Sequence, residues 1–253
     1  MHTSAQRGGW RHVTATIVGG AGLAALITVT AQPAGAGRSI GSTYAFSEGT
    51  GQITVDRSTY HLDGVLGSSD AVEDSDPTWI KGASRSTKAL HFDGGDFVTV
   101  PDSPALEGQR ITVGAVVRAT APGAYRYVLS KGAVGCEMAS YGLYTAASGG
   151  LTFYVSNGWS FTSSPDAGPA LWDGAWHTVY GTYDGATVRL YVDGVQVGDG
   201  TASTITVQYG LAGDNRVFIG NFGGACASPP GFVGDIDSAA VLHDVVRWSP
   251  PRG

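Results

Sequence analysis

The sequence is poor in charge and has no basic cluster. Charged residues make up 14% of the 253-residue chain, and acids outnumber bases so that the formal net charge is −6. An acidic chain of this kind repels a phosphate backbone and an anionic lipid surface. We therefore expect no nucleic-acid partner and no adsorption to a membrane surface.

Cysteine is equally scarce, because only Cys136 and Cys226 are present. Neither cysteine lies in a Cys-x-x-Cys pair or within a few residues of a histidine, so a metal site or a nucleophilic thiol has no support. In an exported chain two thiols most simply form one disulfide. We predict a Cys136–Cys226 bond that closes a loop of about 90 residues.

One long uncharged segment is present, near the N-terminus. Arg7 and Arg11 precede a largely apolar run at 13–31, and a small-residue cleavage site, Ala-Gly-Ala, follows at 34–36. This order is typical of a secretory signal peptide. We predict a signal peptide over 1–36, a mature domain over 37–253 and an extracellular location. An uncleaved membrane anchor is the alternative, since nineteen residues approach the spanning length.

Helical periodicity is almost absent from the rest of the chain. Glycine accounts for 39 residues, and short runs of β-branched and aromatic residues recur between Asp-Gly, Gly-Gly and proline-containing breaks. Such runs predict strands, which we expect at 42–46, 89–93, 96–100, 111–119, 126–132, 141–146, 151–156, 177–183, 187–193, 205–210, 217–222 and 235–243. So many short strands without helices indicate an all-β protein, an antiparallel β-sandwich or jelly roll.

The clearest stretch is 176–198, which predicts a three-stranded meander. Asp-Gly pairs at 184–185 and 193–194 suit tight hairpin turns, because the central residues of those turns need positive φ. Between the turns, Val188, Leu190 and Val192 share one face of a strand. We expect that face to lie in the core.

A set of segments spread along the chain carries a family resemblance. In order they are YAFSEGTGQITVDRS, ALHFDGGDFVTVP, SKG, YGLYT, WDGAWHTVYGTYDGATVRLYVDG, IGNF and FVGDID. Together they resemble the laminin-G-like members of the concanavalin A-like lectin/glucanase superfamily, over nearly all of 37–253. The resemblance implies a jelly roll of two curved antiparallel sheets. It does not choose a function, because the superfamily includes lectins, carbohydrate-binding modules, adhesion modules and glucanases.

A glucanase activity would depend on paired carboxylates. Glucanases of this superfamily carry two glutamates around an aspartate on one strand, placed as nucleophile and general acid. The chain has four glutamates, at Glu48, Glu73, Glu107 and Glu137. None lies in such a pattern, and the aspartates at 235 and 237 lack flanking glutamates. We therefore predict no catalytic residues and no enzyme.

The aspartates near the C-terminus have a second interpretation, as metal ligands. In this superfamily a calcium ion often ties the first strands to the last, so the resemblance implies a structural calcium held by Asp93 and Asp237, with Asp96 and Asp235 in reserve. On a regular strand Asp237 shares a face with apolar residues, and its carboxylate then needs a cation or several donors. A β-bulge there would remove the conflict, and loop N–H groups or Arg189 are the alternative partners.

Aromatic and amide side chains are the candidates for sugar binding. A lectin surface stacks an aromatic ring on the apolar face of a sugar and bonds its hydroxyls with polar groups. The segment YVSNGWSF at 154–161 fits best, because an Asn-Gly turn presents the tryptophan to solvent. We predict Tyr154, Asn157 and Trp159 as ligand-binding residues. The further candidates are Tyr125, Tyr127, Tyr144 and Asn221.

These features predict a secreted, lectin-like module that binds a carbohydrate or a glycoprotein without cleaving it. A protein-binding adhesion module is the first alternative, and a glycoside hydrolase is the second. Nucleic acid is not expected as a partner, nor is a membrane once the signal peptide has been removed.

Overall fold

The computed structural model describes residues 41–226 and 230–247. The predicted signal peptide over 1–36 lies outside these residues. The described part is nearly all strand, and its helices are two short 3₁₀ turns, η1 (Pro104–Leu106) and η2 (Pro169–Leu171). None of the helices in this part of the chain is long and apolar enough to cross a membrane.

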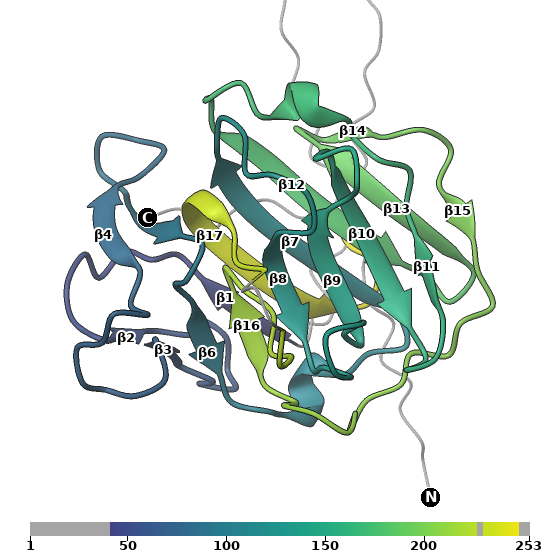
Figure 1. The fold of residues 1–253 in the computed structure, drawn as a ribbon, viewed down its shortest axis with the longest axis horizontal. Coiled ribbons are helices and arrows are strands. Elements are labelled where there is room, and N and C mark those ends of the chain that lie inside the picture. Colours follow the sequence, from purple (N-terminus) through teal and green to yellow (C-terminus); the bar gives the residue numbers. More distant parts are fainter. Residues whose placement is uncertain (1–40, 227–229, 248–253) are drawn as a thin grey trace, which may run out of the picture. The chain divides into compact units, whose positions relative to one another are not determined.

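The first of two antiparallel sheets has nine strands. Its order is β14-β13-β12-β7-β17-β5-β4, with β1 paired to β17 and β15 paired to β13 (Figure 1). The bounds are β1 (Gly41–Tyr44), β4 (Thr78–Lys81), β5 (Lys88–Asp93), β7 (Ile111–Arg118), β12 (His177–Tyr183), β13 (Thr187–Val192), β14 (Val195–Gln196), β15 (Thr201–Ala202) and β17 (Val233–His243). The long strand β17 pairs with β7 on one side and with β5 and then β1 on the other.

The second sheet has eight strands in the order β11-β10-β9-β8-β16-β6-β3-β2. Its bounds are β2 (Ile53–Thr54), β3 (Gly64–Leu66), β6 (Val98–Val100), β8 (Tyr127–Lys131), β9 (Tyr141–Thr145), β10 (Leu151–Ser156), β11 (Phe161–Ser163) and β16 (Val217–Ile219). Two such sheets facing each other form a sandwich, which confirms the predicted fold class.

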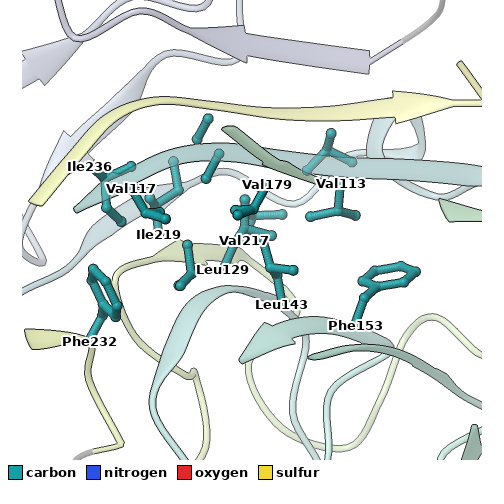
Figure 2. Packing of buried hydrophobic residues seen from close by; sticks show 14 of the residues in the cluster. Val113, Val117, Leu129, Leu143, Phe153, Val179, Val217, Ile219, Phe232 and Ile236 are labelled. Atoms are coloured by element: carbon teal, nitrogen blue, oxygen red, sulfur yellow. The ribbon is translucent and has the colours of Figure 1, made fainter. Parts of the chain in front are cut away.

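Apolar side chains from the inner faces of both sheets fill the core. Figure 2 shows Val113 and Val117 of β7 above Leu143 and Phe153 of the other sheet. The layers approach closely at Gly181, where a Cβ atom would lie 2.0 Å from Cγ of Phe153. A glycine is therefore needed under the ring, and burying a phenylalanine side chain stabilises the fold by about 2–3 kcal/mol.

The predicted meander is confirmed. Val188 and Leu190 are fully buried, and Asp193 and Gly194 have φ values of 50° and 80° in a two-residue turn between β13 and β14. The earlier Asp-Gly pair lies in a longer connection, because residues 184–186 all separate β12 from β13.

One predicted strand is wrong. Residues 205–210 are not in a strand, because a side chain takes the place of a neighbouring strand there. The amide of Gln109 accepts a hydrogen bond from the backbone N–H of Val207 and donates one to its carbonyl, at 2.8 Å each. In addition, the structure contains strands β2, β3, β4, β11 and β15, each of two to four residues, which the sequence pattern did not reveal.

Candidate functional site

A pocket of about 400 Å³ opens on the outer face of the eight-stranded sheet. Strands β8 to β11 turn alternate residues to this face, while the intervening residues such as Leu143 and Phe153 lie in the core. The described lining residues are Tyr125, Tyr127, Cys136, Glu137, Met138, Tyr144, Tyr154, Phe161, Phe222, Cys226 and Pro230. Most are aromatic or apolar, with tyrosine hydroxyls and one carboxylate among them.

Four aromatic rings form the floor of the pocket. Tyr127 is central, with its ring stacked on Tyr144 at 5.2 Å and on Phe222 at 4.8 Å between centroids. Tyr154 meets Tyr144 edge to face at 5.1 Å. These distances are the favoured ones for aromatic pairs, so each ring fixes the orientation of its neighbours.

A glycine beneath the rings makes this packing possible. Gly142 of β9 lies opposite Tyr154 of β10. A Cβ atom on Gly142 would lie 2.5 Å from Cε1 of Tyr154 and 2.9 Å from Cε1 of Tyr127. Any larger residue would displace both rings, so the shape of the floor depends on the absence of a side chain at this position.

The tyrosine hydroxyls of the floor are linked to each other and to the backbone. The hydroxyl oxygens of Tyr127 and Tyr154 are 3.1 Å apart, and the Ala139 N–H donates to the Tyr154 hydroxyl at 2.7 Å. Burial raises the pKa of Tyr127 to about 12 and also raises the pKa of Tyr144 and Tyr154. All three therefore stay neutral at physiological pH and can both donate and accept hydrogen bonds.

Two more aromatic residues form an exposed rim. Tyr125 is 58% exposed and Phe161 is 52% exposed, and the Phe161 ring lies 5.5 Å from that of Tyr154. Glu137 is also exposed and brings the single carboxylate among the described lining residues. The pocket thus has an apolar floor, an aromatic rim and a few polar groups, which is the usual composition of a small-molecule site.

The predicted Cys136–Cys226 disulfide is present and forms part of the pocket wall. Its Cα atoms are 4.9 Å apart, although the two residues are 90 positions apart in the sequence. The bond joins the loop between β8 and β9 to the loop that follows β16. Both loops contribute lining residues, so the disulfide fixes the width of the pocket.

The three predicted ligand residues lie in different settings. Tyr154 lines the pocket and is only 2% exposed. Asn157 shapes the turn instead, because its side-chain oxygen accepts hydrogen bonds from the N–H groups of Trp159 at 3.1 Å and Ser160 at 2.9 Å. Trp159 is 91% exposed beside that turn and is not among the described lining residues. A ligand role for Asn157 or Trp159 stays a prediction.

Of the further candidates, the three tyrosines lie in the pocket and Asn221 does not. Asn221 is buried, and its amide donates to the Asp96 carbonyl at 3.4 Å. Sequence reasoning missed Phe161, Phe222 and Glu137 as lining residues. Phe161 could have been predicted from the Asn-Gly turn. The hairpin at that turn pairs Phe161 with Ser156, and Ser156 lies on the same face of β10 as Tyr154.

Asp237 is hydrogen-bonded by the hairpin between β4 and β5. A bulge between Ile236 and Ser238 interrupts the pairing of β17 with β7, which releases the carboxylate from the alternation of the strand. Asp237 Oδ1 then accepts a hydrogen bond from the Ala83 N–H at 2.8 Å, while burial raises the pKa of this carboxyl group. Arg189, the other partner considered, pairs with Asp184 at 2.6 Å.

The two predicted calcium ligands do not share a site. The Asp237 carboxylate bonds to Ala83 and Thr87, in the hairpin that precedes β5, whereas Asp93 is the last residue of β5. Six positions of extended chain separate Thr87 from Asp93, a distance of about 20 Å. Asp93 instead accepts a hydrogen bond from the Gly95 N–H at 2.8 Å.

The reserve ligands are also engaged by the protein. Asp96 accepts from the Asp93 N–H at 2.9 Å, and Asp235 lies 2.7 Å from both the His91 imidazole and the Arg118 guanidinium. Within the described residues, no group of three or more His, Cys, Asp or Glu side chains could hold a metal ion. These residues therefore do not fit one calcium ion tying β5 to β17.

Comparison with solved structures supports the same fold. Domain 4 of AbnA, an extracellular arabinanase from Geobacillus stearothermophilus solved with arabinotriose, superposes with a TM-score of 0.57 at 16% identity, covering 80% of this chain and 91% of that domain. A structure of botulinum neurotoxin type C, a toxin whose cell entry depends on interaction with two ganglioside molecules, gives 0.55 at 10% identity, covering 81% of this chain and 48% of that one. A sialidase from Trypanosoma rangeli gives 0.51 at 16% identity, covering 81% and 30%. At these identities the similarity shows the fold alone.

A family comparison is more specific. No curated protein sequence matches the chain. The model of a laminin G family, described as concanavalin A-like lectin/glucanases superfamily, matches residues 92–249, which is more than half of the chain. The match includes all the strands around the tyrosine pocket. With its two-sheet sandwich, the chain belongs to the concanavalin A-like lectin/glucanases superfamily.

Proposed function

We propose that this protein is a secreted, non-catalytic module that binds a neutral saccharide in the tyrosine pocket. The observation that carries the proposal is the pocket of about 400 Å³ whose lining combines stacked tyrosine rings with one carboxylate. The disulfide is consistent with an oxidising, extracellular location.

The chemistry of the pocket suits a sugar ring. Flat aromatic faces cover the apolar C–H surface of a pyranose or furanose, and hydroxyl groups that both donate and accept match those of the sugar. Glu137 supplies a strong acceptor for sugar hydroxyls and repels carboxylate or sulfate groups. The ligand should therefore be a neutral oligosaccharide of one to three residues, given the volume.

The lining residues favour binding over hydrolysis. Glycoside hydrolysis ordinarily uses two carboxyl groups on either side of the bond that breaks. Glu137 has no carboxylate partner among the described lining residues. The solved arabinanase domain contains a bound arabinotriose, which makes short arabinose oligomers a rational first probe.

Calorimetric titration with arabinotriose and a panel of neutral mono-, di- and trisaccharides tests the proposal. We expect one of them to bind, and Tyr125→Ala or Phe161→Ala to weaken that binding about tenfold each, because each removes a ring from the rim. Both side chains are half exposed, so neither change should unfold the domain. Trp159→Ala is the matched control, since it removes an exposed aromatic ring outside the lining.

The controls separate the alternatives. Binding that disappears in Trp159→Ala and survives Phe161→Ala would move the site to the hairpin tip and contradict the pocket assignment. Release of reducing ends during the titration, lost in Glu137→Gln, would show a hydrolase instead. Repeating the titration in a chelator tests the calcium prediction, and we expect the affinity to be unchanged.

A further inference from the structure

A second hollow lies on the nine-stranded sheet, away from the tyrosine pocket. Its volume is about 740 Å³, and its lining residues are Gly49, Trp79, Ile80, Lys81, Gly82, Lys88, His91, Arg118 and Asp235. We call it the basic groove. Lys81, Lys88 and Arg118 give it three positive charges against one negative charge, in a chain whose net charge is −6.

The single acid in the basic groove is already neutralised. Asp235 Oδ1 lies 2.7 Å from Nδ1 of His91, and Oδ2 accepts from Nε of Arg118 at 2.7 Å. Arg118 also lies over the Trp176 ring, 4.6 Å from its centroid. Asp235 and Trp176 therefore hold Arg118 in place, on the face of the sheet opposite to that of Lys81 and Lys88.

The two lysines of the groove repel each other. Lys81 of β4 and Lys88 of β5 lie directly opposite each other in the antiparallel pair. Like charges at opposite positions destabilise a strand pair. No ion pair forms for either lysine within the described residues, where Lys131 and the paired arginines find acidic partners. An anion between the two ammonium groups would relieve their repulsion.

An aromatic side chain completes the groove. Trp79 lies on β4, and its indole N–H donates to the Gly51 carbonyl at 2.9 Å, which fixes the ring. Trp79 is partly buried against the core, and a fixed indole next to a pair of lysines suits a sugar ring that bears an acidic group. The open shape and large volume suit a segment of a chain better than a single small ion.

We propose that the basic groove binds an acidic polysaccharide through its carboxylate or sulfate groups. The acidic group accepts hydrogen bonds from the ammonium groups of Lys81 and Lys88, and the sugar ring packs on Trp79, which shares their face of the β4–β5 pair. The lysine pair is a local positive site on a chain with a net charge of −6, so a short acidic segment is attracted here while a long phosphate backbone meets the net negative charge of the whole chain. This site is independent of the tyrosine pocket, which lies on the other sheet.

Affinity chromatography and titration with defined polymers test this inference. The probes are polygalacturonate for carboxylate, dextran sulfate for sulfate, and unmodified dextran as the neutral control, each in low and moderate salt. The test variant is Lys81→Gln/Lys88→Gln. Its matched control is Arg110→Gln/Arg216→Gln, which removes two positive charges from positions outside the basic groove.

We expect at least one acidic polymer to bind and dextran not to bind, and the stronger polymer identifies the acidic group. Lys81→Gln/Lys88→Gln should weaken that binding about tenfold or more, as expected when charge-assisted contacts are lost. Because both lysines are exposed and their repulsion is removed, this variant should melt at or above the temperature of the wild type. Phe161→Ala, which alters the tyrosine pocket, should leave polymer binding unchanged.

Three results would overturn the inference. Equal losses in the test variant and the Arg110→Gln/Arg216→Gln control would show only a response to net charge. Retention of unmodified dextran as strong as that of the acidic polymers would show that no acidic group is recognised. Binding of double-stranded DNA as strong as that of the acidic polymers would show a general attraction to polyanions rather than recognition of an acidic sugar.

Discussion

Gly142→Ala tests the tyrosine pocket with the smallest change of side chain, since it adds one methyl group and removes no interaction. The new Cβ would lie 2.5 Å from Tyr154 and 2.9 Å from Tyr127, closer than carbon atoms pack. Neither ring can move freely, because the Tyr154 hydroxyl accepts from the Ala139 N–H and the Tyr127 ring lies between Tyr144 and Phe222.

Overpacking of this kind costs about 1–3 kcal/mol. For a domain of about 200 residues that corresponds to a melting temperature lower by about 2–12 °C. The displaced rings should also close or reshape the floor of the pocket. We therefore expect Gly142→Ala to lower the melting temperature measured by circular dichroism, and to abolish the saccharide binding measured by calorimetric titration.

Gly95→Ala is the matched control. Its Cβ would meet only Asp93 Oδ1, at an ordinary 3.4 Å, so the free energy of unfolding should change by less than about 0.5 kcal/mol. Wild-type melting temperature and wild-type binding in Gly142→Ala would refute the packing argument, because the floor would then tolerate a side chain where the structure leaves no room for one.

Three further predictions concern other parts of the domain. Cys136→Ser/Cys226→Ser should lower the free energy of unfolding in urea by about 4–5 kcal/mol, the value expected for a loop of 90 residues, and should also weaken saccharide binding. Lys131→Ala should cost about 3 kcal/mol in the same assay, because the ammonium group is buried within 2.6 Å of Asp102. Burial raises the pKa of Asp96 from 3.8 to about 6, so the folded state binds this proton more tightly than the unfolded state. The contribution of Asp96 to stability should therefore fall as pH rises from about 4 to about 6, so in urea titrations across this range the stability of Asp96→Asn should rise relative to that of the wild type.

The fold could be predicted because its determinants are local. Strand β7 alternates residues toward the core, and the Asp193-Gly194 pair suits the two-residue turn that it forms. The wrong strand prediction at 205–210 arose because a contact with a distant residue decides the structure there. Those residues have the composition of a strand, but the backbone N–H and carbonyl of Val207 bond to Gln109, which is almost a hundred positions away in the sequence.

The candidate site could be predicted only in part, since it depends on contacts between distant segments. The Asn-Gly turn that follows Tyr154 made this residue a candidate. Its place in the aromatic floor depends on Gly142, Tyr127 and Phe222, which lie in other segments of the chain. The alternation argument for Asp237 correctly required either a partner or a bulge. It could not choose between them, because a bulge depends on the pairing partner, β7.

The most direct test of the account is a nuclear magnetic resonance titration with tyrosine rings labelled. A neutral oligosaccharide that binds should shift the ring signals of Tyr127, Tyr144 and Tyr154 together. Tyr180 and Tyr191 are the internal control, since they stack on each other at 4.6 Å on the other sheet, and their signals should stay in place. Saccharide binding that leaves the three pocket signals unmoved would contradict the central claim that the tyrosine pocket is the binding site.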